Sequence, residues 1–449
     1  MTEAERLALF ESMPVRAAVR RQIVPAVISQ MIALIYSLAD TYFVGLLNSP
    51  VQTAAVTVSY SSFVMLTAIS NLFGVGGASA LSRALGKRNT DAARDIAAVS
   101  FWFGLAAAVL FSLVFALFAR PILYLAGATD ATWAATIGYA RWVIIFGGPC
   151  TILSTLLANL LRAEGSARTA SFGMSLGGVM NIVLDPLLIL PRFAGLGAAG
   201  AGLATAVSNG VAAVFLLCVV LLKRSMLSLA AERLKRTGLY LSRILKVGLP
   251  SALQYALTVV AIAAQAKFVS RYPTEAVAAL GIVKKLDQLP LYFSIGVSSG
   301  LLPLLAYTDS AGAYDRRRAA FRHGTAISLG FALVCLVVFE LFAEPLAGVF
   351  MRDAVTVNYA AAFLRRMVTA MPLMSVAYPM IIQFQAMGRV RESLVCSILR
   401  KGVLDIPLLF LMDALVPLYG LMWVQPIVDF ISLAVAVILY LRIRGKEQR

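Results

Sequence analysis

Apolar stretches of roughly 20 residues recur from one end of this chain to the other. Each is long enough to cross the roughly 30 Å hydrocarbon core of a bilayer as a helix. We count twelve, centred near residues 34, 66, 105, 148, 178, 210, 257, 292, 333, 372, 403 and 430. Backbone polar groups in lipid must bond within their own segment, so helices are expected rather than open strands. With 60% apolar residues and a mean hydropathy of +0.85, the chain is predicted to be an all-α integral membrane protein.

The net charge of +17 is distributed unevenly between the two ends of these predicted spans. One end receives the arginines near the N-terminus, the basic segment at 223–246 and the C-terminal sequence RIRGKEQR. Because positively charged loops stay inside, both termini are predicted to be cytoplasmic, with the protein in the cell (inner) membrane. Basic loops can also bind nucleic acid, but membrane topology accounts for these charges and no nucleic-acid partner is expected.

The two halves of the chain resemble each other at an offset near 224 residues. FALFARP at 115–121 matches FELFAEP at 339–345 in five of seven positions, and other landmarks fall at similar offsets. An offset of six spans gives both halves the same orientation, which is the parallel-repeat plan of many secondary transporters. We predict twelve transmembrane helices in two pseudo-symmetric six-helix lobes, residues 1–221 and 244–449, joined by a cytoplasmic linker at 222–243.

Two carboxylates of the first half lie inside predicted spans. Asp40 has Tyr36 four residues before it, and Asp185 has Asn181 at the same spacing, so each pair shares a helix face. Pro186 follows Asp185 and frees a backbone carbonyl one turn earlier. Neither acid has a local cation, and an ionised group at mid-bilayer costs about 2.5–3.5 kcal/mol, which protonation removes. A role in ion exchange is the preferred hypothesis, with a fixed hydrogen bond in a packed interface as the alternative.

The second half is different at the equivalent positions. Gln265 corresponds to Asp40 and cannot titrate, and Asp405 has Lys401 four residues before it, which predicts a fixed ion pair. The roles of Asp429 and Glu340 stay open. The four cysteines are separated in sequence and there is one histidine, so neither a metal centre nor a His-based catalytic triad is expected.

Several segments together resemble the multidrug and toxic compound extrusion (MATE) transporters along essentially the whole chain. They are LADTYFVG, GGASALSRALGKRNTDAAR, LLRAEGSARTA, MNIVLDPLLIL, GAAGAGLATAVSN, KVGLPSALQ and FQAMGRVRES, in this order. Each is degenerate alone, but the ordered set is specific, and within the family it looks most like the prokaryotic DinF-like branch. The resemblance implies two six-helix lobes and drug efflux coupled to inward flow of H+ or Na+.

The resemblance also implies a cation site in the N-terminal lobe. Carried over by position, its residues would be Asp40, Asp185, Tyr36, Asn181 and Thr205, whereas Asn159, Met174 and Gln265 would line the substrate cavity. Acids that the NorM-like branch has in helices 7 and 10 are missing here, which argues against coupling through the C-terminal lobe. No cofactor is expected beyond the coupling ion, which is H+ or else Na+ bound at Asp40 and Asp185.

The sequence thus predicts a monomeric antiporter, not an enzyme, that exports amphipathic and often cationic organic compounds. Its partners would be small-molecule drugs and membrane lipids. Acidic cavity residues suit cations, and the methionines offer adaptable apolar walls. Two alternatives stay open: a flippase for a lipid-linked sugar or another amphiphile with the same fold, and a membrane-embedded enzyme. The enzyme would need a cluster of His, Asp and Glu at a membrane face, which the sequence does not show.

Overall fold

The computed structural model describes residues 3–222 and 225–447, and all regular elements within these ranges are helices. The first half contains α1 (Glu3–Leu7), α2 (Val15–Gly45), α3 (Pro50–Gly86), α4 (Thr90–Leu125), α5 (Asp130–Ala140), α6 (Gly148–Ala163), α7 (Ala167–Ile189) and α8 (Gly197–Leu221). The second half contains α9 (Thr237–Val269), α10 (Thr274–Ser310), α11 (Tyr314–Leu341), α12 (Ala343–Gly348), α13 (Ala354–Met367), α14 (Ala370–Ala386), α15 (Val390–Ile398), α16 (Asp405–Leu415) and α17 (Gly420–Glu447).

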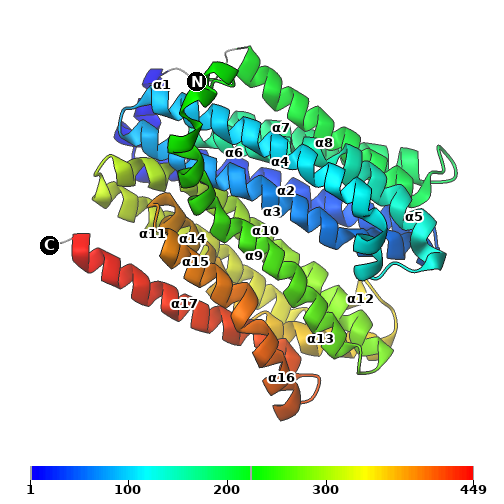
Figure 1. Cartoon of the computed structure of the whole chain (residues 1–449). Coiled ribbons are helices and arrows are strands. Elements are labelled where there is room, and N and C mark those ends of the chain that lie inside the picture. Colours follow the sequence, from blue (N-terminus) through cyan, green and yellow to red (C-terminus); the bar gives the residue numbers. More distant parts are fainter. Residues whose placement is uncertain (1–2, 223–224, 448–449) are drawn as a thin grey trace.

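The long helices cross the molecule in alternating directions, with the first half above the second in Figure 1. The end of the bundle where α2 begins and α17 finishes is here called the terminal face, and the other end the opposite face (Figure 1). Nine of the described helices are long and apolar enough to cross a membrane alone. Two bent pairs, α5 with α6 and α13 with α14, add two spans. The broken run from α15 to α16 occupies the remaining predicted span, so the all-α prediction with two repeated lobes is confirmed.

Proline accounts for the two bends. The first pair bends by 45° and the second by 46°, in the fourth and tenth spans, which are equivalent positions of the two lobes. Pro149 lies in the first turn of α6, and Pro372 lies in the first turn of α14. Proline lacks the N–H that a continuous helix needs but suits the beginning of a new one. Each span therefore breaks just before its proline.

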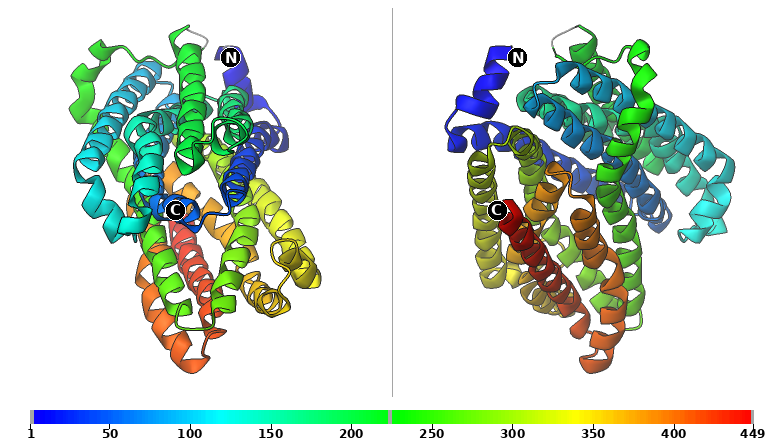
Figure 2. Two further views of the ribbon diagram at one scale, coloured as in Figure 1. Left: turned by 90° about the vertical axis from the view of Figure 1, so that its right-hand side faces the viewer. Right: turned by 60° about the vertical axis from the view of Figure 1, so that its left-hand side comes forward.

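The lobes share a core at the terminal face and have separate cores beyond it. Among the described residues, one large buried cluster joins Phe73 and Leu157 of the first lobe to Leu301 and Phe384 of the second. Towards the opposite face, one buried cluster is drawn wholly from the first lobe and another wholly from the second. The right-hand view of Figure 2 shows the lobes diverging from the terminal face. The shared core thus joins the lobes at the terminal face, whereas their cores are separate towards the opposite face.

Two helix pairs form the largest contacts between the lobes: α3 with α9, and α2 with α10. In the first pair, a Cβ on Gly248 would lie 1.8 Å from the carbonyl oxygen of Leu72. In the second, a Cβ on Gly300 would lie 2.7 Å from the Cα of Ile23. Glycine is required at these positions because the two backbones touch directly.

The connection between the lobes packs on the first lobe. It begins after α8 and contains a short 3-10 helix, Ala231–Arg236, before α9 starts at Thr237. The buried carboxylate of Glu164 accepts hydrogen bonds from Ser225 Oγ at 2.9 Å and from the backbone N–H of Met226 at 3.0 Å. Burial raises the pKa of Glu164, although these hydrogen bonds oppose the shift. Residues 223–224 of the predicted linker lie outside the described residues.

Candidate functional site

The first lobe contains a buried polar cluster between α7 and α8. Asp185 is fully buried, and Asn181, one turn earlier on α7, donates from Nδ2 to its Oδ1 at 3.3 Å. The same amide reaches Thr205 Oγ1 on α8 at 3.5 Å. The helix α7 continues to Ile189 despite Pro186, so the four-residue spacing places both side chains on one face as predicted. The structure thus brings Asp185, Asn181 and Thr205 together.

The helix α2 places Tyr36 and Asp40 beside this cluster. It packs along α7, and the charge of Asp40 interacts with both Asp185 and the Tyr36 hydroxyl. Three oxygens of the group are buried without a hydrogen-bond partner among the described residues: Oδ1 of Asp40, Oδ2 of Asp185 and Oδ1 of Asn181. Buried acceptors left unpaired are costly. A proton shared between the carboxylates, or a small cation, is the chemical species that such a set of oxygens would accept.

The three residues predicted to line a substrate cavity lie apart from this cluster. Asn159 packs against Gly74, and its Oδ1 accepts from Arg162 Nη1 at 3.3 Å. Met174 packs against the core of the terminal face. Gln265 lies in the second lobe, where its amide donates to the backbone oxygen of Leu421. Arg162 is itself buried, and the sequence analysis did not single it out.

The predicted ion pair between Lys401 and Asp405 is wrong. Lys401 donates to Gln425 at 2.8 Å, and in the part of the chain that the structure describes no group donates a hydrogen bond to the buried Oδ2 of Asp405. The reason is local: Lys401 lies in the π-helical turn Leu399–Val403 with non-helical angles (φ −133°, ψ 21°), so α-helical spacing does not apply across it. The neighbouring residue, Arg400, instead forms a buried ion pair with Asp429.

The side chain of Lys285 places a positive charge from the second lobe beside the first-lobe site, which was not predicted from the sequence. Lys285 of α10 donates from Nζ to Thr41 Oγ1 at 3.2 Å, and its charge interacts with that of Asp40, the preceding residue. Asp40 thus has no cation near it in the sequence but has one across the interface between the lobes. The pair KK at 284–285 was visible in the sequence, but the packing of α10 on α2 was not.

A hollow of about 610 Å³ opens at the opposite face, beside the turn from α2 to α3. Its lining residues, Gly45 to Val58, include no ionisable side chain, so it is separate from the acidic cluster. A small polar pocket of about 20 Å³ lies within the second lobe, lined by Gln265, Lys284, Lys401 and Asp405 among others. It has room for about one water molecule.

Two repeated helical lobes with an acid cluster buried among helices long enough to span a membrane are typical of membrane transporters. Residues 25–187 and 250–411 each match the MatE protein family. The multidrug export protein MepA of Staphylococcus aureus is 30% identical over 439 residues, which is 97% of this chain and 96% of that protein. The chain therefore belongs to the MATE family and is a multi-pass membrane transporter, not an enzyme.

Solved structures show the same fold over the full length. An outward-facing multidrug resistance MATE family transporter of the MOP superfamily superposes with a TM-score of 0.93 at 23% identity, with 100% of both chains covered. A MATE structure in the straight conformation superposes with a TM-score of 0.92 at 24% identity, again with 100% of both chains covered.

Proposed function

We propose that this protein is a multidrug efflux antiporter of the cell (inner) membrane with both termini in the cytoplasm. It exports amphipathic, often cationic organic compounds in exchange for H+ or Na+. The single observation that carries the proposal is the pair Asp40 and Asp185 inside a transporter fold, where each acid has one buried oxygen without a hydrogen-bond partner among the described residues. The name of the relative MepA, a multidrug export protein, supports the substrate class.

The packing supports an assignment of the side of the membrane to which the described state is open. With the termini cytoplasmic, the shared core closes the cytoplasmic end, and the separate lobe cores lie on the outer side. The protein is then in an outward-facing state. An ion entering from outside reaches the acid cluster of the first lobe. When it neutralises Asp40 or Asp185, the electrostatic attraction that holds a cationic drug weakens, and the drug leaves to the outside.

The available energy is sufficient for efflux. A membrane potential of 100 mV supplies about 2.3 kcal/mol per proton. A gradient of one pH unit adds about 1.4 kcal/mol. Their sum sustains roughly a 500-fold gradient of a neutral compound for each proton exchanged. We expect the protein to act as a monomer in contact with lipid, without a nucleic-acid partner.

The test is efflux of ethidium from vesicles that contain the purified protein. A pH gradient or a sodium gradient is imposed at the same membrane potential, and the proposal expects efflux with at least one of them. The variant Asp185→Asn should abolish this efflux while the amount of folded protein stays the same. Glu340→Gln is the matched control, because Glu340 is exposed at the end of α11 and away from the acid cluster. Efflux that needs neither gradient, or that survives Asp185→Asn, contradicts the proposal.

A further inference from the structure

The first described residues of the chain are packed into the protein at the terminal face. They form α1 and a π-helical turn, Ala8–Ser12, which precede α2. Leu9 and Phe10 are both fully buried. A short segment at a chain end is usually mobile unless particular contacts hold it. The contacts of this segment therefore indicate what it does.

The segment binds the second lobe through its aromatic ring and its backbone. The ring of Phe10 stacks on Tyr307 of α10, with centroids 4.6 Å apart and planes 10° apart. Arg316 of α11 donates from Nε to the backbone oxygen of Phe10 at 2.7 Å and from Nη2 to that of Leu9 at 3.1 Å. These contacts join α10 and α11 to a segment that continues directly into α2 of the first lobe.

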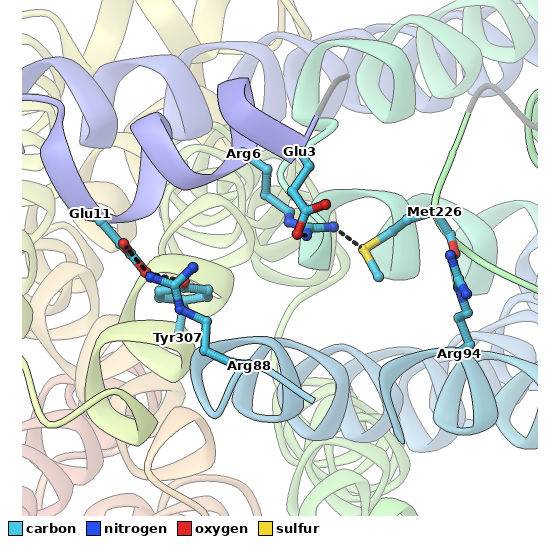
Figure 3. A network of polar contacts seen from close by, with 7 residues as sticks. All are labelled: Glu3, Arg6, Glu11, Arg88, Arg94, Met226 and Tyr307. Carbon is cyan, nitrogen blue, oxygen red and sulfur yellow. Dashed lines mark hydrogen bonds and ion pairs between the residues drawn. The ribbon is translucent and has the colours of Figure 1, made fainter. Parts of the chain in front are cut away.

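One carboxylate of the segment contacts both lobes. Glu11 pairs with Arg88, in the turn between α3 and α4, at 2.8 Å. Its other oxygen accepts a hydrogen bond from the hydroxyl of Tyr307. Figure 3 shows the carboxylate of Glu11 directed at both Arg88 and Tyr307, with Arg6 of the same segment near Met226 of the inter-lobe connection. A single side chain thus links the first lobe, the second lobe and the segment.

We propose that residues 3–12 are a clasp that holds the lobes together at the terminal face. The lobes cannot separate there while Phe10 remains stacked on Tyr307 and Glu11 bridges Arg88 and Tyr307. The clasp must release at least one lobe before the site opens to this face. Its strength therefore sets the balance between the described state and the state open to the terminal face. This inference needs only that the lobes separate during transport, and its test measures no transport.

The parts of the clasp contribute unequally. The Glu11–Arg88 pair is partly solvent-exposed, with 60% of the arginine side chain accessible, so it adds little by itself. The stacked ring of Phe10 is fully buried and carries most of the contact. Loss of the ring should therefore open the terminal face more than loss of the carboxylate charge.

A cysteine at Ser79 reports the opening. Ser79 is fully buried between the lobes, where its hydroxyl donates to the backbone oxygen of Gln385 at 2.7 Å. Ser79→Cys is made in a variant without the four native cysteines, and its rate of reaction with a small thiol reagent is measured in lipid nanodiscs. The reagent reaches this position only when the lobes part at the terminal face.

The expected result is a labelling rate about tenfold higher in Phe10→Ala, with a smaller rise in Glu11→Gln and Tyr307→Phe. Glu3→Gln is the matched control, because among the described residues Glu3 pairs only with Arg6 of the same segment, at 3.4 Å, and its rate should stay unchanged. Tyr307→Phe removes only the hydroxyl and keeps the stacked ring, so it gives a result even if Phe10→Ala does not fold. A wild-type labelling rate in Phe10→Ala, or, if that variant does not fold, in both Glu11→Gln and Tyr307→Phe, would overturn the proposal.

Discussion

Arg400 and Asp429 form a buried ion pair in the second lobe, with Nε and Oδ1 2.7 Å apart and side-chain exposures of 1% and 0%. Gln425 extends the pair by donating to the other oxygen of Asp429 at 2.9 Å. The guanidinium also lies over the ring of Tyr378, 4.2 Å from its centroid. This group joins α17 to the π-helical turn between α15 and α16, where the backbone itself is irregular.

Asp429→Asn should destabilise the protein strongly, because it leaves Arg400 buried without its ion-pair partner. Breaking one partner of a buried pair costs about 3–5 kcal/mol. Asp405→Asn should cost far less, because Lys401 already bonds to Gln425. Thermal unfolding in detergent, followed by tryptophan fluorescence, compares the two variants. A larger loss of Tm for Asp405→Asn would restore the ion pair that the sequence predicted.

Lys285→Met should increase the affinity for a cationic substrate such as ethidium. The change removes a positive charge next to Asp40 while it keeps the length of the side chain. An increase of about tenfold corresponds to the loss of roughly 1.4 kcal/mol of charge repulsion. Fluorescence titration of the purified protein measures it. Lys284→Met is the control, since Lys284 lines the small pocket of the second lobe. Equal affinities in wild type and Lys285→Met would show that Lys285 does not act on the site.

Gly248→Ala should weaken the contact between the lobes. The new Cβ would lie 1.8 Å from the carbonyl oxygen of Leu72, so α3 and α9 would have to move apart. Such overpacking typically costs about 1–3 kcal/mol. Gly281→Ala is the matched control in α10, because a Cβ there meets nothing within 4 Å, and alanine favours a helix over glycine. A Tm as high in Gly248→Ala as in Gly281→Ala would contradict the direct backbone contact.

The orientation in the membrane can be tested with single cysteines. Ala231→Cys lies in the exposed part of the connection between the lobes, and Ala194→Cys lies in the exposed turn between α7 and α8 at the opposite face. In intact cells that express each variant without native cysteines, a membrane-impermeant thiol reagent should label only Ala194→Cys. Labelling of Ala231→Cys would invert the topology.

The fold was predictable because the length of the apolar stretches and the repeat between the two halves both indicate it. Apolar stretches long enough to cross a bilayer gave the helices, and the match of FALFARP with FELFAEP indicated the two lobes. Asn181 and Asp185 were placed together correctly because α7 is continuous through both. Lys401 and Asp405 have the same four-residue spacing. Because Lys401 lies in a π-helical turn with non-helical angles, the two side chains do not share a helix face.

The remaining features depend on packing between helices. Lys285 reaches Thr41 from a helix almost 250 residues later in the chain, a separation of 244 positions. No local spacing indicates such a contact. Phe10 and Glu11 lie in a short segment that contains both apolar and charged residues. Their contacts with Tyr307 and Arg88 are known only from the structure. Contacts within one regular helix can thus be predicted from the sequence, whereas contacts between the lobes cannot.

The most direct test of the account is a comparison of binding with transport in Asp40→Asn. Asparagine keeps the shape of the side chain but cannot gain or lose a proton or balance a cation. The account predicts that ethidium still binds with an affinity within about tenfold of wild type, because Asp185 and the rest of the site remain. It predicts no efflux at any imposed pH or sodium gradient. Wild-type efflux by Asp40→Asn would show that Asp40 only packs and that the coupling site lies elsewhere.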